Sequence, residues 1–149
     1  MSAHVTFGGY RNRKRIARPA IEWFLQHRKL NRFNTFIHVV DRRMEDDGAC
    51  VSIDGHWRPR YFEVEMDNRL NPKDYLSTLF HELVHVEQRL RGTHKMRYDA
   101  RLCRTVNKWK GKVVPPETAY MDEPWEVEAY ATEKELYNSY KEYEAKLKD

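Results

Sequence analysis

The spacing of apolar side chains divides the first half of the chain into one helical segment and three strand segments. Ile16, Ala20 and Trp23 recur every three or four positions, which predicts a helix over residues 16–28. Short runs rich in β-branched and aromatic residues follow, and they predict strands at 35–41, 49–54 and 61–66. Because only short turns, at 45–48 and 55–56, separate the last two strands from their predecessors, we expect an antiparallel meander.

The second half begins with a clear helix start. Asn71 is a good N-cap, Pro72 suits the first helical position, and Asp74 complements the helix dipole, so a long helix is predicted to run to Arg91 and end at Gly92. The rest predicts a helix over 94–106, a loop over 108–119 with an extended piece at 113–114, and a last helix over 124–147. We therefore expect an α+β fold with a small, mostly antiparallel three-stranded sheet, forming a single domain over residues 1–149.

Composition limits the classes of protein to which the chain could belong. Its 149 residues and 18.0 kDa are about the size of one domain. A mean hydropathy of −0.91 and the lack of a long apolar run argue against a membrane span. The N-terminus has no apolar stretch typical of a secretory signal, and Cys50 and Cys103 are too few for a disulfide scaffold. We therefore expect a cytoplasmic protein without a membrane partner.

Charge is unevenly distributed along the chain, although the net charge is only +4. Residues 89–112 hold nine Lys or Arg and one acid, Asp99, whereas residues 116–149 hold ten acids and four lysines. The basic segment is either an ordinary solvated surface or a patch that binds nucleic acid or an acidic partner.

One motif in the long predicted helix indicates metal chemistry. His81 and His85 are four residues apart, so both imidazoles can reach one ion from the same helix face, while Glu82 lies beside the ion as a candidate general base. The main apolar stripe points away from the histidines, and this leaves them free to line a cleft. The predicted cofactor is Zn²⁺, with His81 and His85 as metal ligands and Glu82 as the catalytic residue.

A catalytic zinc site needs a third protein ligand. The metzincin pattern requires a histidine at position 91, where this chain has Arg91. Three candidates remain: Glu126 and Glu128 at the start of the last predicted helix, and His94, nine residues after His85. Helix phase does not separate the two glutamates, since they lie on opposite flanks of the apolar stripe.

The stretch from His81 to His85, with Glu126-Val127-Glu128-Ala129 further on, resembles the gluzincin-type HExxH metallopeptidases, and especially small minigluzincin-like proteins of bacteria and phages. The resemblance implies a zinc metallopeptidase with Glu126 as third ligand and an edge strand beside the cleft that holds the substrate backbone. The strand at 61–66 is the candidate for that edge. The family often carries Asp or Asn four residues after the ligand glutamate, where this chain has Tyr130. A phage-encoded enzyme would act in the host cytoplasm.

Two alternatives remain open. In the first, His94 and the basic residues after it resemble Spartan-type, DNA-associated proteases, with His94 as third ligand and nucleic acid bound through residues 89–112. In the second, the chain is a metal-binding regulatory protein without activity. In the peptidase interpretation the partner is a peptide or protein substrate. Four residues could stabilise the oxyanion of the reaction, and sequence does not rank them: Tyr120, Tyr130, His94 and Arg97.

Overall fold

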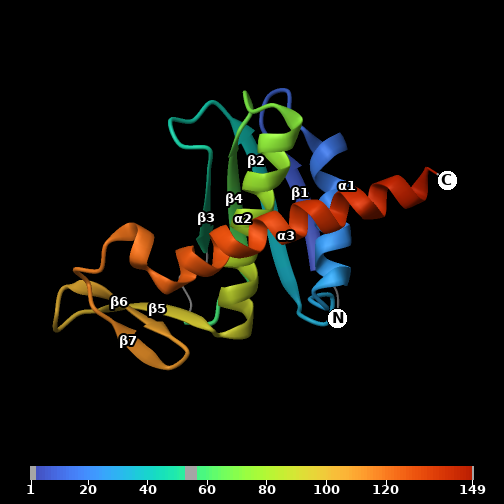
Figure 1. Ribbon diagram of the computed structural model, residues 1–149. Helices are drawn as coiled ribbons and strands as arrows, with labels where there is room; N and C mark the ends of the chain where they lie inside the picture. Colours follow the sequence, from blue (N-terminus) through green and yellow to red (C-terminus); the bar gives the residue numbers. More distant parts are fainter. Residues whose placement is uncertain (1–2, 53–56, 149) are drawn as a thin grey trace.

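The structure is a computed structural model that describes residues 3–52 and 57–148 (Figure 1). It contains three α-helices and two β-sheets, which confirms the predicted α+β class. The first sheet is built from β1 (Ala3–Gly8), β2 (Thr35–Arg42), β3 (Gly48–Ser52) and β4 (Tyr61–Asp67). The α-helices are α1 (Lys14–His27), α2 (Pro72–Arg91) and α3 (Pro124–Leu147). The predicted strand end at 53–54 and the turn at 55–56 lie outside the described residues.

The predicted three-stranded meander is wrong in its topology. The first sheet has four strands in the order β1-β2-β4-β3, and β1, β2 and β4 are parallel. Among the described residues, strand β3 pairs only with β4, in antiparallel register, and forms an edge of the sheet. Helix α1 provides the crossover that a parallel β1–β2 pair requires. The antiparallel meander was predicted because the turns on either side of β3 are short. Strand β1 was not predicted from the sequence.

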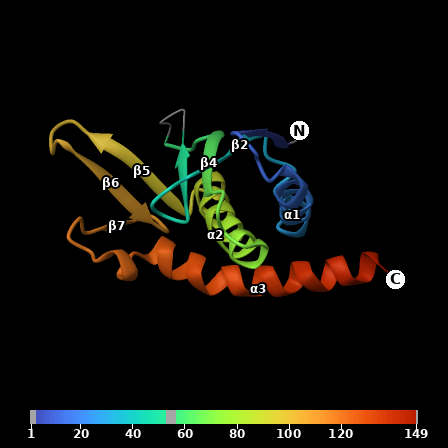
Figure 2. The same cartoon turned by 90° about the horizontal axis from the view of Figure 1, so that it is seen from above.

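Helices α1 and α2 cover one face of this sheet, and α3 crosses the outer side of α2 (Figure 2). Alternate residues of the central strands face the helices and are buried, among them Ile37, Val39, Phe62 and Val64. They pack against helix residues such as Phe24 and Phe80, which are fully buried. Each such side chain contributes about 1.5–3 kcal/mol of burial free energy. This core holds α2 rigidly beside the sheet edge. Among the described residues, no helix is both long and apolar enough to cross a bilayer.

Helix α2 begins and ends as predicted. The side chain of Asn71 accepts a hydrogen bond from the backbone N–H of Asp74 at 2.9 Å, and Gly92 ends the helix in the left-handed conformation with φ of 77°. Near the helix start, the Tyr75 hydroxyl donates to buried Asp41 at 2.6 Å, and the backbone N–H of Arg13 donates to the same carboxylate at 2.8 Å. Asp41 therefore joins α1, β2 and α2 at one end of the core.

The predicted helix over 94–106 is wrong. This region forms an antiparallel sheet of β5 (His94–Asp99), β6 (Arg104–Trp109) and β7 (Lys112–Val114), which extends away from the main body (Figures 1 and 2). Asp99 accepts hydrogen bonds from the backbone N–H groups of Arg101 and Leu102, so it fixes the turn between β5 and β6. A short 3-10 helix, η1 (Tyr120–Asp122), then leads into α3, which follows the predicted bounds closely.

Candidate metal centre and its cleft

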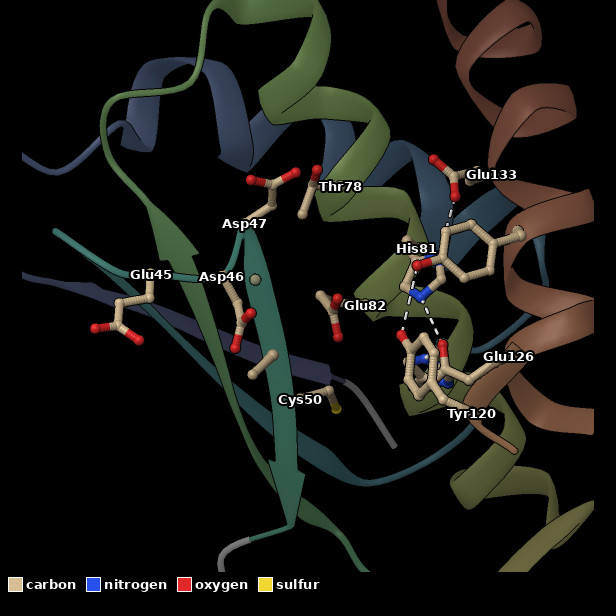
Figure 3. Close-up of a pocket in the computed structure, with 14 residues that line it drawn as sticks. Glu45, Asp46, Asp47, Cys50, Thr78, His81, Glu82, Tyr120, Glu126 and Glu133 are labelled. Carbon is tan, nitrogen blue, oxygen red and sulfur yellow. Dashed lines mark hydrogen bonds and ion pairs between the residues drawn. The ribbon is translucent and has the colours of Figure 1, made fainter. Parts of the chain in front are cut away.

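Helices α2 and α3 bring His81, His85 and Glu126 together. The Nε2 atoms of His81 and His85 lie 2.9 Å and 3.2 Å from the same oxygen, Oε1 of Glu126 (Figure 3). One donor atom from each residue lies within 4.8 Å of the other two. Two imidazoles and a carboxylate are a donor set that catalytic zinc sites use, so the residues fit the ion in number and chemistry.

The orientation of His85 is determined by Gln88. The Gln88 amide nitrogen donates to the backbone carbonyl of Trp125 and to Glu128 Oε1, each at 3.0 Å, which fixes which end of the amide is the oxygen. That oxygen lies 2.9 Å from Nδ1 of His85. Because an amide oxygen can only accept, Nδ1 of His85 must carry the hydrogen. In the neutral ring, the lone pair of Nε2 then points to the shared centre, as a metal ligand must.

Glu133 does the same for His81. Its Oε1 lies 3.1 Å from Nδ1 of His81, and an ionised carboxylate can only accept, so Nδ1 again donates (Figure 3). The ring of Tyr130 packs on His81 with centroids 4.4 Å apart and limits its rotation. Tyr130 thus contributes packing at the position where the resembling family often has Asp or Asn, and Glu133 supplies the carboxylate that orients the histidine.

The close approach of His81, His85 and Glu126 favours a positive charge at the point where they meet. Burial alone would lower the pKa of His81, but hydrogen bonds to Glu126 and Glu133 raise it to about 9. Burial also acts to lower the pKa of His85, but the pKa is raised because the hydrogen bonds to Glu126 and Gln88 and the charges of Glu126 and Glu82 together outweigh it. Conversely, both histidines lower the pKa of Glu126 against the effect of burial. Without a metal, protons on the imidazoles balance the negative charge of Glu126 and Glu133. A divalent cation would balance the same charge and would displace the protons from Nε2.

Glu82 points into the cleft beside the histidines (Figure 3). It is only 7% exposed, and among the described residues no hydrogen bond ties up its carboxylate. Burial raises the pKa of Glu82 to about 7, although the neighbouring histidines act in the opposite direction. A buried carboxyl with a pKa near neutrality, beside a group of residues that could hold a metal, is suited to exchange protons with water.

The cleft around the centre has a volume of about 730 Å³ and is strongly acidic. One wall is the loop between β2 and β3 followed by the first residues of β3, and the other is formed by α2, η1 and α3. Among the described residues, no Lys or Arg lines the cleft. Its carboxylates are those of Glu45, Asp46, Asp47, Glu82, Glu126 and Glu133.

A glycine permits the close approach of the edge strand to α2. A Cβ atom on Gly48 would lie 2.9 Å from Cγ2 of Thr78 and 3.3 Å from Cγ of Glu82, closer than packed side chains tolerate. Strand β3 can therefore run directly beside the motif helix, with Gly48, Ala49 and Cys50 lining the cleft. The edge strand at the cleft is β3, not the predicted strand at 61–66, which is interior as β4.

The structure separates the sequence-predicted site residues. Glu126 joins the cluster, whereas Glu128 binds the amide of Gln88. His94 stacks on Trp125 at 4.1 Å, its Nε2 lies 2.8 Å from Asn107, and burial lowers its pKa to about 4. Arg97 lies over Trp57, outside the cleft, whereas Tyr120 and Tyr130 line it.

Sequence reasoning missed two residues, Gln88 and Glu133. Both had a detectable signal. Gln88 is three residues after His85, and Glu133 is seven residues after Glu126, so each falls on the same helix face as the ligand it accompanies. The pairing of Glu133 with His81 depends on the packing of α3 against α2, which spacing along one helix does not reveal. No protein-family model, no curated protein and no solved structure matches this chain.

Proposed function

We propose that the protein is a zinc-dependent peptidase whose metal is held by His81, His85 and Glu126. The observation that carries the proposal is the fixed tautomer of both histidines. Gln88 and Glu133 each accept from an Nδ1–H group, so in both rings Nε2 is the atom that faces Glu126 and that can bind a metal once it loses its proton. A purely structural ion cluster would not need two separate residues to orient both Nε2 atoms toward one point.

A zinc ion in this donor set would polarise the scissile carbonyl and lower the pKa of a coordinated water towards about 7. Glu82 accepts a proton from the attacking water, because its carboxylate is buried beside the cluster with no competing hydrogen bond among the described residues. It then delivers that proton to the leaving amine. Tyr120 and Tyr130, whose hydroxyls lie 3.4 Å apart at the rim, are the residues placed to donate to the developing oxyanion.

The substrate backbone pairs with the outer edge of β3. Within residues 3–52 and 57–148 no strand pairs with this edge, which lies beside the cleft, so an extended peptide can add to it as a further strand. Small residues at Gly48 and Ala49 leave room for that strand. We place the activity in the cytoplasm, where thiols such as Cys50 and Cys103 stay reduced.

Glu82→Gln tests the proposal directly. We expect the variant to bind zinc like the unchanged protein, because Glu82 is not in the ligand set, and to lose about 10²–10⁴-fold in peptide hydrolysis. Metal content is measured by elemental analysis and hydrolysis with a mixed peptide library. Glu22→Gln, an exposed change on α1, is the matched control. Full activity of Glu82→Gln would refute the assigned base.

The Spartan-type alternative receives no geometric support at its third ligand, since His94 is engaged with Asn107 and Trp125. The regulatory alternative is an outcome of the same test. Zinc bound by His81, His85 and Glu126, with no hydrolysis of any library peptide or protein by the unchanged chain, would favour a metal-stabilised regulator over an enzyme.

A further inference from the structure

A second hollow lies at the amino ends of β2 and β4, and its chemistry is opposite to that of the cleft. Its volume is about 670 Å³, and four arginines line it: Arg32, Arg58, Arg60 and Arg91. No carboxylate lines this hollow within the ranges that the structure describes. Arg91 is held by an ion pair of 2.9 Å with Glu87, which does not itself line the hollow.

The ring of Phe33 lies among these cations. The guanidinium carbons of Arg32, Arg60 and Arg91 lie 5.1–5.9 Å from the ring centre of Phe33. Two of the arginines are anchored to backbone carbonyls: Arg58 donates to Leu90 at 2.8 Å, and Arg91 donates to Arg28 at 2.7 Å. Anchored guanidinium groups lose little freedom when they bind an anion, and their planar edges suit phosphate.

A row of stacked rings continues from the hollow across the sheet. Phe36 of β2 stacks on Tyr61 of β4 with centroids 4.7 Å apart, and His4 of β1 stacks on the other side of Phe36 at 4.9 Å. These side chains lie on the sheet face away from the helices, because their neighbours Thr35 and Ile37 are buried on the helix side. The outer members of this row, His4 and Tyr61, are exposed, and exposed aromatic side chains stack on nucleic-acid bases regardless of sequence.

The positive surface also extends onto the second sheet. Lys95, Arg97 and Lys108 surround Trp57 at 5.1, 5.2 and 5.6 Å from its ring centre. This group adjoins the hollow, since atoms of Arg58 and Lys95 both lie within 3.4 Å of the Cβ position at Gly92. Together, the hollow and the Trp57 group form one arginine–aromatic surface with two adjoining clusters of cations.

We propose that this arginine–aromatic surface binds single-stranded nucleic acid, with phosphates on the cations and bases on the rings. A polymer is favoured over a mononucleotide because two clusters of cations, one around Phe33 and one around Trp57, adjoin each other. Single strands are favoured over a duplex because only unpaired bases can reach the rings. The inference rests on residues outside the acidic cleft and is independent of the proposed peptidase activity.

Charge removal gives the first test. Fluorescence anisotropy of a labelled oligothymidylate, titrated with the full chain at low salt, measures affinity and its salt dependence. Arg32→Gln/Arg97→Gln should weaken binding by about tenfold or more and reduce the salt slope by about 1.4, because about two phosphate contacts are lost. Lys14→Gln/Arg15→Gln removes the same charge from exposed positions on α1 and should change the affinity little. Absence of binding at low salt, or equal loss in both variants, overturns the proposal.

Stacking gives the second test. Tyr61→Ala leaves every charge in place and should weaken oligothymidylate binding by about tenfold, since one base loses its platform. An abasic strand with the same phosphates should bind the unchanged protein more weakly than oligothymidylate and be insensitive to Tyr61→Ala. Equal affinity for the abasic strand, or equally effective displacement by polyglutamate, would show that the surface recognises charge alone and would overturn the assignment.

Discussion

The acidic cleft and the arginine–aromatic surface lie at opposite ends of the same strands. The loop with Asp46 and Asp47 follows the carboxyl end of β2, whereas Phe36 and Tyr61 stand at the amino ends of β2 and β4. Parallel pairing of β2 with β4 creates this separation, because it gathers like ends of the strands at one rim. A net charge of only +4 therefore conceals two regions of strong and opposite field.

The two regions also hold their polar groups differently. In the cleft, side chains fix one another, as Gln88 and Glu133 do for the histidines. On the arginine–aromatic surface, backbone carbonyls fix Arg58 and Arg91, while aromatic rings support the remaining cations. The first arrangement points both Nε2 atoms at one position and suits a single ion. The second distributes donors along a surface and suits an extended anion.

The largest effect should come from removing Glu126, the proposed third metal ligand. Glu126→Ala deletes the carboxylate that both Nε2 atoms face, so zinc affinity should fall by more than the 10–100-fold typical of a supporting residue. Glu128→Ala should have a smaller effect, because Glu128 acts through Gln88. Competition with a chromophoric chelator measures both. A greater loss in Glu128→Ala would reverse the assignment, and oligothymidylate affinity should stay unchanged in either variant.

A smaller effect is expected at the residue that orients His81. Glu133→Gln keeps the shape of the side chain but lets an amide face Nδ1, so the preferred tautomer is weakened and zinc affinity should drop about 10–100-fold. Glu135→Gln, an exposed neighbour on α3, is the matched control. Chelator competition on both proteins gives the ratio. If the two variants bind zinc equally, Glu133 is a surface ion partner of His81 without a role in orienting it.

Local signals predicted the parts of the molecule that local chemistry determines. Asn71, Pro72 and Gly92 defined the ends of the motif helix, and the structure confirms them. The spacing of His81 and His85 predicted a shared helix face, and the structure brings their Nε2 atoms to one carboxylate. In each case the physical cause lies within one or two helical turns.

The missed features depend on contacts between distant segments. Strand β1 is stabilised by pairing with β2, which follows it in the chain only after helix α1. Strand β3 lies at the edge because β4 pairs with β2 on its other side. Residues 94–106 have a polar and basic composition that fits a helix as well as a strand. Pairing of His94 with Trp109 and of Tyr98 with Thr105 decides for the hairpin, and it involves residues up to 15 positions apart.

The smallest effect concerns what the acidic cleft selects. Asp46 and Asp47 are exposed on its rim, so in a peptidase they should attract substrates with Lys or Arg near the scissile bond. Each exposed pair is worth about 0.2–1 kcal/mol, and Asp46→Asn/Asp47→Asn should therefore lower kcat/KM for a basic peptide about two- to tenfold. A neutral peptide of the same length is the internal control, and its kcat/KM should not change. Added salt should reduce the preference for the basic peptide in the unchanged protein, because exposed charges are screened. If kcat/KM falls equally for both peptides, the two aspartates support the loop structure and do not select the substrate. The opposite charges of the two regions would then have no consequence for which peptides are cleaved.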